Sequence, residues 1–317
     1  MIAFVFPGQG SQKVGMGAEL AEASSVAREV FGEVDEALKQ KLFALMQEGP
    51  ESELTMTTNA QPAIMANALA VARVLEAGGI ALAEKGEAVA GHSLGEYSAL
   101  AAVGAFSLTD TAKLLRIRGI AMQDAVPIGV GGMCALLGAD LEKAQALADA
   151  AAQGPLPGAQ ASVCEVANDN DPGQVVLSGH LSAIDRAVEL AKEHGIKRAI
   201  KLPVSAPFHC SLMQPAALRM AGALETTPPG AFRLPVYANV TAAAVTDPEE
   251  QRRLLVEQIT GRVRWRESVL AMHEAGITHF VELGGKVLGP MIRKIAPDAT
   301  VTSVVGMDDI DALAGLI

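Results

Sequence analysis

The stretch that decides the fold reads Ala90-Gly91-His92-Ser93-Leu94-Gly95-Glu96-Tyr97-Ser98-Ala99-Leu100. Apolar residues precede it and small, helix-forming residues follow it, so the pattern predicts a strand, a tight turn and a helix in that order. A G-x-S-x-G nucleophile elbow needs this context, because it presents the serine hydroxyl at the carboxyl end of a strand. Gly91 and Gly95 have no Cβ, and strand and helix can therefore close around the turn.

Ser93 is the candidate nucleophile of this elbow. At the start of a helix, free backbone N–H groups point to where negative charge develops on an attacked carbonyl. The alternative is a chance G-x-S-x-G in a chain that contains 31 glycines. The strand before the motif and the helix after it favour the functional interpretation.

Composition indicates a globular protein with an aliphatic core. The chain has 317 residues, of which 50% are hydrophobic and 3% aromatic. This length suffices for one large domain, or for a large domain that carries a smaller one. The net charge of -11 argues against nucleic-acid binding, which requires a basic face.

Cysteine, histidine and hydropathy patterns point to a cytoplasmic protein without a metal site. The three cysteines have no C-x-x-C spacing, which is typical of reduced thiols. No two histidines have H-x-x-x-H spacing, so no metal site is expected. The N-terminal apolar run lacks the flank of a signal peptide, and polar residues interrupt the apolar region 60–83. We expect neither a signal peptide nor a membrane span.

Strand-like and helical segments alternate over much of the chain. Strands are predicted at 2–6, 234–240, 279–283 and 300–305, and helices at 18–46, 57–76, 110–125, 249–260, 265–275 and 287–295. Such alternation predicts an α/β fold with a largely parallel sheet.

The middle of the chain has a different order of elements. It is predicted as strand 133–137, helix 141–152, strands 161–166 and 174–178, helix 182–194 and strand 197–204, with a turn at 168–173. This β-α-β-β-α-β order is that of a ferredoxin-like unit. We therefore predict a small domain at residues 129–200, inserted into a large domain formed by residues 1–128 and 201–317.

Three more side chains are candidates by position. Pro207 excludes regular structure, so His209 lies on a loop at the predicted domain junction, where clefts form. Such a histidine is commonly just exposed, but beside a nucleophile it would be a general base. Arg118 lies near the apolar side of its helix, either with its charged end in water or as a buried guanidinium facing a carboxylate. Gln61 begins a helix, where solvated residues are the commoner case.

Six motifs then carry a resemblance over essentially the whole chain. They are Phe6-Pro7-Gly8-Gln9-Gly10-Ser11-Gln12, Gln61-Pro62, Gly91-His92-Ser93-Leu94-Gly95-Glu96-Tyr97-Ser98, Arg118-Gly119, Pro207-Phe208-His209 and Glu282-Leu283-Gly284-Gly285-Lys286-Val287-Leu288. In this order they resemble the malonyl-CoA:acyl carrier protein transacylases of bacterial type II fatty acid synthesis. That resemblance implies a hydrolase-like α/β domain with a ferredoxin-like insert.

The resemblance also implies roles for single residues. Ser93 resembles the acyl-accepting nucleophile, and His209 the base, oriented by the backbone carbonyl of Gln258 in place of a carboxylate. The amides of Gln9 and Leu94 resemble the oxyanion hole. In addition, Arg118 resembles the residue that pairs with the malonyl carboxylate, and Gln61 a glutamine near that pocket.

The implied reaction is a ping-pong transfer through a malonyl-serine ester. Its partners would be malonyl-CoA and an acyl carrier protein, with no nucleic acid, membrane or resident cofactor, and a monomer is expected. An acidic carrier would meet a basic rim, for which the candidates are Lys113, Arg116, Lys286, Arg293 and Lys294.

Several rivals share parts of this pattern. A serine thioesterase or hydrolase has the same elbow, and malonate decarboxylase or polyketide systems use a similar malonyl transferase. A degenerate interaction module would have kept the fold alone. One departure from the family is the loop Gly284-Gly285, which lacks a proline and is one residue short. We expect it to change local geometry without loss of activity.

Overall fold

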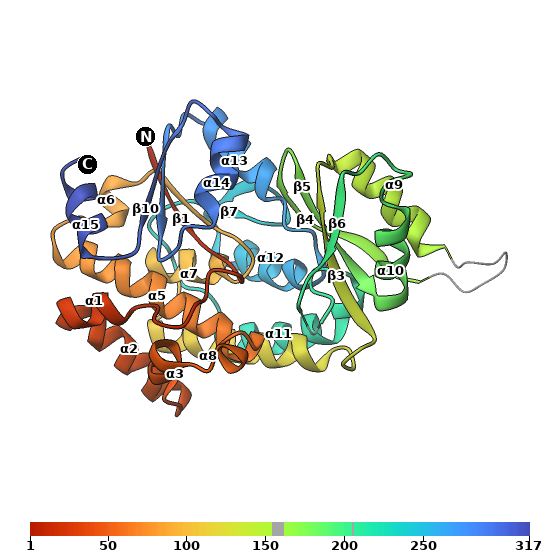
Figure 1. Cartoon of the computed structure of the whole chain (residues 1–317). Coiled ribbons are helices and arrows are strands. Elements are labelled where there is room, and N and C mark those ends of the chain that lie inside the picture. The colour runs from red at the N-terminus through yellow and green to blue at the C-terminus, as the bar shows by residue number, and fades with distance from the viewer. Residues whose placement is uncertain (154–161, 205) are drawn as a thin grey trace.

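Two β-sheets organise the computed structural model, which describes residues 1–153, 162–204 and 206–317 (Figure 1). Within those residues, six strands form the larger sheet in the order β10-β9-β1-β2-β7-β8, and four form the smaller in the order β4-β5-β3-β6. Their bounds are β1 Ile2–Phe6, β2 Ala88–Gly91, β3 Gly131–Leu137, β4 Cys164–Asp171, β5 Gln174–His180, β6 Arg198–Lys201, β7 Val236–Ala238, β8 Ala243–Val245, β9 His279–Leu283 and β10 Thr300–Val304.

Helices cover the larger sheet on both faces and the smaller sheet on one (Figure 1). Their bounds are α1 Ala18–Ala23, α2 Ser25–Leu38, α3 Leu42–Glu48, α4 Glu51–Leu54, α5 Thr57–Ala77, α6 Leu82–Lys85, α7 Gly95–Ala102, α8 Leu108–Asp124, α9 Leu141–Ala152, α10 Leu181–Leu190, α11 Gln214–Thr226, α12 Pro248–Thr260, α13 Trp265–Glu274, α14 Leu288–Ile295 and α15 Met307–Ala314, with a short 3-10 turn at Ser211–Met213.

The larger sheet is mainly parallel, as predicted. β1 runs parallel to both β2 and β9, and this register sets Phe6 beside Gly91 at the end of β2. The β2–β7 and β9–β10 pairs are also parallel, whereas the short β7–β8 pair is antiparallel. The carboxyl ends of β1 and β2 therefore meet at one edge of the sheet, where open α/β sheets bind their ligands.

Alternate residues of β1 face opposite helical layers. Phe4 and Phe6 pack into the core under α5, α7 and α8, whereas Ala3 and Val5 pack against α13 and α14. Burial on both faces explains why this strand reads as an unbroken apolar run.

The smaller sheet has the predicted ferredoxin-like order β3-α9-β4-β5-α10-β6, and its strand pairs are all antiparallel in the described residues. Helices α9 and α10 bury their apolar sides on one face of it. The α/β fold with a ferredoxin-like unit is thereby confirmed.

The turn predicted at 168–173 is wrong. β4 continues through Asp171, and Pro172-Gly173 alone turn the chain. The polar residues of β4 are buried because the large domain supplies their partners. The Asp169 amide donates to the Val263 carbonyl at 2.9 Å, and the Asp169 carboxylate receives two nitrogens of Arg266 at 2.7 and 3.0 Å.

Other differences concern element ends and short elements. The helical region 18–46 is divided into α1, α2 and α3, where Ser24 caps α2 by accepting from the Ala27 amide at 3.3 Å. The strand predicted from Ala161 begins at Cys164, and Ala161 itself lies outside the described residues. β8, α11 and α15 were not predicted. In the described part of the chain, no helix combines the length and hydropathy needed to cross a bilayer.

Arg266→Ala should lower the free energy of unfolding by about 2 kcal/mol, because it leaves the buried Asp169 carboxylate without its positive partner. The loss should not be larger, since the Arg266 guanidinium is partly exposed and solvent weakens the pair. Urea unfolding measures the loss. Arg252→Ala is the control, since its pair with Glu249 lies on the surface of one helix and should matter little. Equal effects of the two substitutions would show that Asp169 does not tie β4 to the large domain.

Candidate active site

The predicted strand, turn and helix are present around Ser93. A Cβ on Gly91 would come within 1.9 Å of the Gly95 backbone, and one on Gly95 within 2.3 Å of the Phe6 carbonyl oxygen. Ser93 itself has a left-handed backbone with φ of 54°. Its hydroxyl is thus presented at the carboxyl edge of the sheet, as in a nucleophile elbow.

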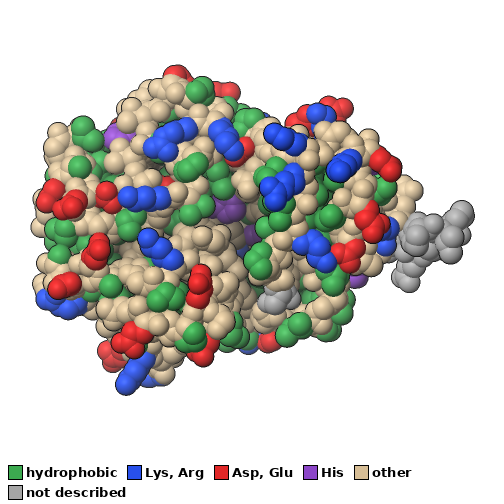
Figure 2. Space-filling view, viewed as in Figure 1, with side chains coloured by type: hydrophobic (Ala, Val, Ile, Leu, Met, Phe, Trp, Pro, Cys, Tyr) green, Lys and Arg blue, Asp and Glu red, His purple; other side chains and the backbone are tan. Residues whose placement is uncertain are grey.

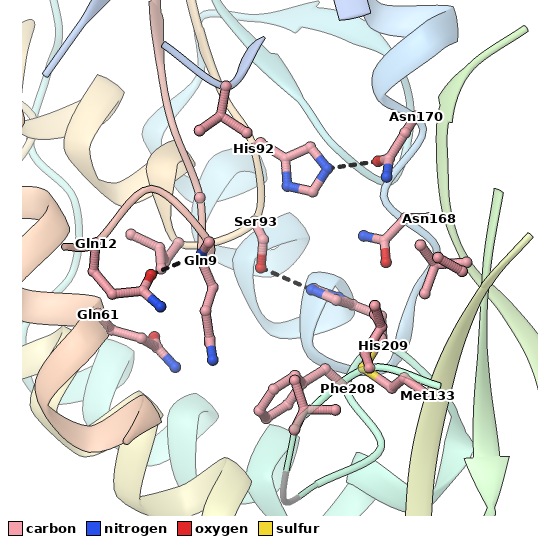
Figure 3. A pocket seen from close by; sticks show the side chains of 18 of the residues that line it. Gln9, Gln12, Gln61, His92, Ser93, Met133, Asn168, Asn170, Phe208 and His209 are labelled. Atoms are coloured by element: carbon pink, nitrogen blue, oxygen red, sulfur yellow. Dashed lines mark hydrogen bonds between the residues drawn. The ribbon is translucent and has the colours of Figure 1, made fainter. Parts of the chain in front are cut away.

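Ser93 and His209 form a hydrogen-bonded pair (Figure 3). The Ser93 Oγ lies 2.7 Å from His209 Nε2, and His209 Nδ1 lies 2.8 Å from the Gln258 backbone carbonyl. Because a carbonyl can only accept, Nδ1 carries the ring proton and Nε2 is free to accept the serine proton. The Gln258 carbonyl therefore fixes the tautomer that a general base requires.

Burial favours the neutral, basic form of His209. Desolvation, followed by the nearby charge of Arg118, lowers the pKa of His209 to about 3. The imidazole is only 4% exposed and has a left-handed backbone with φ of 57°. The alternative of an exposed loop histidine is wrong.

Arg118 is a buried guanidinium, so the alternative with its charged end in water is also wrong. Its Nη1 donates to Gln61 Oε1 at 2.8 Å, and its Nη2 to Gln258 Oε1 at 2.9 Å and to Ser93 Oγ at 3.1 Å. These three partners are neutral, and the guanidinium lies 5.7 Å from the centre of the Tyr97 ring. A carboxylate entering the pocket would meet a desolvated positive charge beside the Ser93 hydroxyl.

Gln61 is buried rather than solvated. Its Nε2 donates to Thr57 Oγ1 at 3.0 Å, which turns its Oε1 towards Arg118. A Cβ on Gly119 would come within 2.8 Å of the Thr57 carbonyl, so Gly119 lets α8 approach α5 closely. The pair Arg118-Gly119 thus places the guanidinium against Gln61.

Gln9 and Leu94 both line the pocket around Ser93. The Gln9 side chain is held by Thr57, whose Oγ1 donates to Gln9 Oε1 at 3.1 Å. Gly8 lets this loop pass close to the elbow, because a Cβ there would lie 2.6 Å from the His92 carbonyl. The role of the two amides as an oxyanion hole stays a prediction.

A buried polar cluster, which the sequence did not predict, lies behind the elbow. Asn239, just after β7, accepts from the Ser93 amide at 2.7 Å and donates to the Gly91 carbonyl at 2.7 Å. Glu96 and Gln251 join it. The Gln258 side chain donates to the Ser93 carbonyl at 3.0 Å, whereas its backbone carbonyl holds His209. The strand order could have indicated this cluster. Because β2 and β7 are parallel neighbours, the residues that follow their carboxyl ends must lie close together.

The pocket is a cavity of about 360 Å³ between the two sheets. A hollow in the middle of the visible face contains histidine side chains (Figure 2). Asn168 and Asn170 line the pocket from β4 (Figure 3). His92 Nε2 lies 2.8 Å from Asn170 Oδ1, so the elbow and the small domain are bonded across the cavity.

The shortened loop after β9 is closed by a carboxylate. Glu282 accepts from the amides of Val287, Leu288 and Gly289 at 2.7 to 2.9 Å and so caps α14. Gly284 has a φ of +82° and packs against the backbone of α5. Val287 and Leu288 line the pocket. The expectation that the missing residue changes local geometry without loss of activity stays a prediction.

Comparison with known proteins assigns the family. A family model described as "Acyl transferase domain" matches residues 3–288. The chain belongs to this acyl transferase family. It is 43% identical over 295 residues to the malonyl CoA-acyl carrier protein transacylase of Bacillus subtilis, covering 93% of this chain and 90% of that protein.

Solved structures agree with this acyl transferase fold. The acyl-carrier-protein-S-malonyltransferase of Bartonella henselae has a TM-score of 0.95 at 48% identity, covering 99% of this chain and 98% of its own. A second structure, at 38% identity and a TM-score of 0.92, is a malonyl-transacylase in complex with its type II PKS acyl-carrier protein and covers 100% of this chain and 99% of its own. The described residues contain no cluster of metal-ligating side chains.

The rate of Ser93 acylation should be nearly constant between about pH 8 and about pH 5, because His209 stays neutral over that range. Folding stability should instead fall as the pH drops below 6.5, since the unfolded chain takes up a proton that the folded state excludes. Single-turnover kinetics and thermal unfolding across this range measure the two effects. A rate that halves near pH 6.5 would reveal an ordinary solvated imidazole.

Proposed function

We propose that this acyl transferase moves the malonyl group from malonyl-CoA to the phosphopantetheine thiol of an acyl carrier protein. The observation that carries the proposal is the position of Arg118, buried in the same pocket as Ser93 and 3.1 Å from its hydroxyl. A nucleophile next to a desolvated guanidinium favours acyl groups that end in a carboxylate. The names of the relatives from Bacillus and Bartonella support the same substrate class.

The first half-reaction acylates the enzyme. His209 Nε2 takes the proton of Ser93 Oγ as the oxygen attacks the thioester carbonyl, and a tetrahedral oxyanion forms. We assign the backbone amides of Leu94 and Gln9 to this oxyanion. Its collapse breaks the C–S bond, and the imidazolium returns the proton to the departing thiolate of coenzyme A.

The second half-reaction reverses these roles. His209 deprotonates the carrier thiol, the thiolate attacks the malonyl-serine ester, and Ser93 recovers its proton from the imidazolium. No carboxylate contacts the imidazole in the described residues; the Gln258 carbonyl at 2.8 Å orients it instead. Coenzyme A enters this scheme as a substrate thioester, and we propose no resident cofactor.

The carrier is the partner that the comparisons support. One structural relative was solved with its acyl-carrier protein, and that carrier belongs to a polyketide system. We propose that the carrier of fatty acid synthesis is the partner here, in the cytoplasm, with the monomer as the active unit. Ser93, His209 and Arg118 all come from a single chain, which fits a monomer.

The candidates for a basic rim differ in their surroundings. Lys286 lies 3.8 Å from Asp309, Lys294 lies 2.9 Å from the buried Asp171, and Arg116 donates to Asn59 and Gln40. Lys113 is exposed, and Arg293 donates to the Val301 carbonyl at 3.1 Å.

Two further basic residues extend this rim beyond the five candidates. Lys197 and Arg198 line a second cavity with Lys294, and Gln174 lines both that cavity and the active-site pocket. Lysine and arginine side chains also lie on both sides of the hollow in Figure 2.

Incubation with malonyl-CoA should give one malonyl adduct by intact mass, and Ser93→Ala should abolish it.

Arg118→Ala should lower malonylation by about 100-fold or more and shift the preference towards acetyl-CoA, because a charged hydrogen bond to the carboxylate is lost. A carrier thiol should discharge the wild-type adduct. Free malonate without an adduct would instead identify a hydrolase, and no reaction at all an interaction module.

Arg198→Glu should raise the KM for the carrier about tenfold through reversed electrostatic attraction, while self-acylation by malonyl-CoA stays close to wild type. Steady-state transfer at varied carrier concentration measures this. Arg253→Glu on the exposed side of α12 is the control for net charge. An unchanged KM would exclude this side of the pocket as the docking surface.

A further inference from the structure

Glu96 is a fully buried carboxylate in the first turn of α7, behind the wall of the pocket. One of its oxygens accepts from Gln251 Nε2 at 2.7 Å, and the other from the Asn239 amide at 3.0 Å and from Gln258 Nε2 at 2.8 Å. All three partners are N–H donors. This arrangement suits the ionised carboxylate, which can only accept.

One amide joins this carboxylate to the guanidinium of the pocket. Gln258 Nε2 donates to Glu96, while Gln258 Oε1 accepts from Arg118 Nη2 at 2.9 Å. Burial raises the pKa of Glu96, and the attraction of Arg118 opposes that rise; Glu96 in turn opposes the fall that burial causes in the pKa of Arg118. The two buried charges therefore stabilise one another through a polarised amide.

We infer that Glu96 is the counter-charge of Arg118 in the free enzyme and that it limits how strongly the pocket holds an acyl carboxylate. This inference rests on the proposed function. A malonyl carboxylate on Arg118 brings a second negative charge to the same guanidinium, so substrate and Glu96 compete for it. Restrained affinity is useful to a transferase, because the acyl group bound in the first half-reaction must leave in the second.

Glu96→Gln removes the charge while conserving shape. The new side chain can keep the contacts to Asn239 and Gln258 through its carbonyl oxygen. Its new NH2 group would face Gln251. Gln251 Oε1 is buried without a hydrogen-bond partner, and it can accept from this NH2 group once the side-chain amide of Gln251 rotates by half a turn. The substitution therefore tests the charge of Glu96 separately from the hydrogen bonds that hold the elbow.

The ratio of malonyl to acetyl acylation should rise about tenfold in Glu96→Gln, because the competing charge is gone. Thermal stability should fall, since Arg118 is left without a counter-charge. The measurement is single-turnover acyl-enzyme formation from malonyl-CoA and from acetyl-CoA, followed by intact mass. A merely structural role for Glu96 would leave the ratio unchanged or lower it, and either result would overturn the inference.

Glu282→Gln is the matched control. Glu282 is equally buried and also receives three N–H groups, but these are backbone amides at the start of α14, and the Ser303 hydroxyl donates to it as well. This variant should lose thermal stability without a change in the malonyl to acetyl ratio. A parallel rise in its ratio would show that any loss of buried charge has this effect, and would count against Glu96.

A comparison of Arg118→Met with the double variant covers the case in which Glu96→Gln alone does not fold. Arg118→Met should lower the Tm, and Glu96→Gln added to it should raise the Tm again, because the uncompensated carboxylate is removed. A Tm for the double variant equal to or below that of Arg118→Met would overturn the inference. Wild-type enzyme that forms no malonyl adduct would contradict the proposed function itself, whatever the two Tm values show.

Discussion

The contact of α7 with the ends of β1 and β2 determines where every other group of the site can lie. Gly95 passes so close to the Phe6 carbonyl, and Gly91 to Gly95, that neither position has room for a Cβ. The turn between them forces Ser93 into a left-handed conformation, at a cost of about 1 to 3 kcal/mol. Asn239 stabilises that conformation, since its side chain accepts from the Ser93 amide and donates to the Gly91 carbonyl. The strained Ser93 is thus held by the side-chain amide of the residue that directly follows the neighbouring strand β7.

The second requirement of the site is a positive charge without water. Arg118 is fully buried, yet its hydrogen-bond partners are two glutamine oxygens and a hydroxyl. Neutral acceptors bind Nη1 and Nη2, whereas the buried Nε has no hydrogen-bond partner among the described residues. Because neutral acceptors cannot neutralise the charge, the pocket retains an attraction for anions. The same charge helps keep His209 unprotonated. In the proposed reaction, the group that would hold the acyl carboxylate therefore also affects the protonation of the imidazole beside Ser93.

Local pattern was sufficient for much of the fold and for part of the site. The unbroken apolar run of β1, the glycines of the elbow and the ferredoxin-like order are short-range features, and the structure has all three. Arg118 could not be decided from its helix, because its burial depends on how closely α8 approaches α5 at Gly119. The polar run of β4 was mistaken for a turn, since its partners Arg266 and Lys294 lie 97 and 123 residues later along the chain. Turn propensity is a local statistic, whereas these buried aspartates depend on tertiary ion pairs.

The alternation of β4 explains how a small domain can form one wall of a precise pocket. Asn168 and Asn170 line the cavity, whereas the alternate residues Asp169 and Asp171 form ion pairs with helices α13 and α14 of the large domain. The wall that faces the acyl group is therefore fixed to the same helices that pack on β1, and the bond between Asn170 and His92 ties it directly to the elbow. Because each contact couples β4 to the large domain rather than to its own helices, the width of the pocket is set by the fold that holds Ser93.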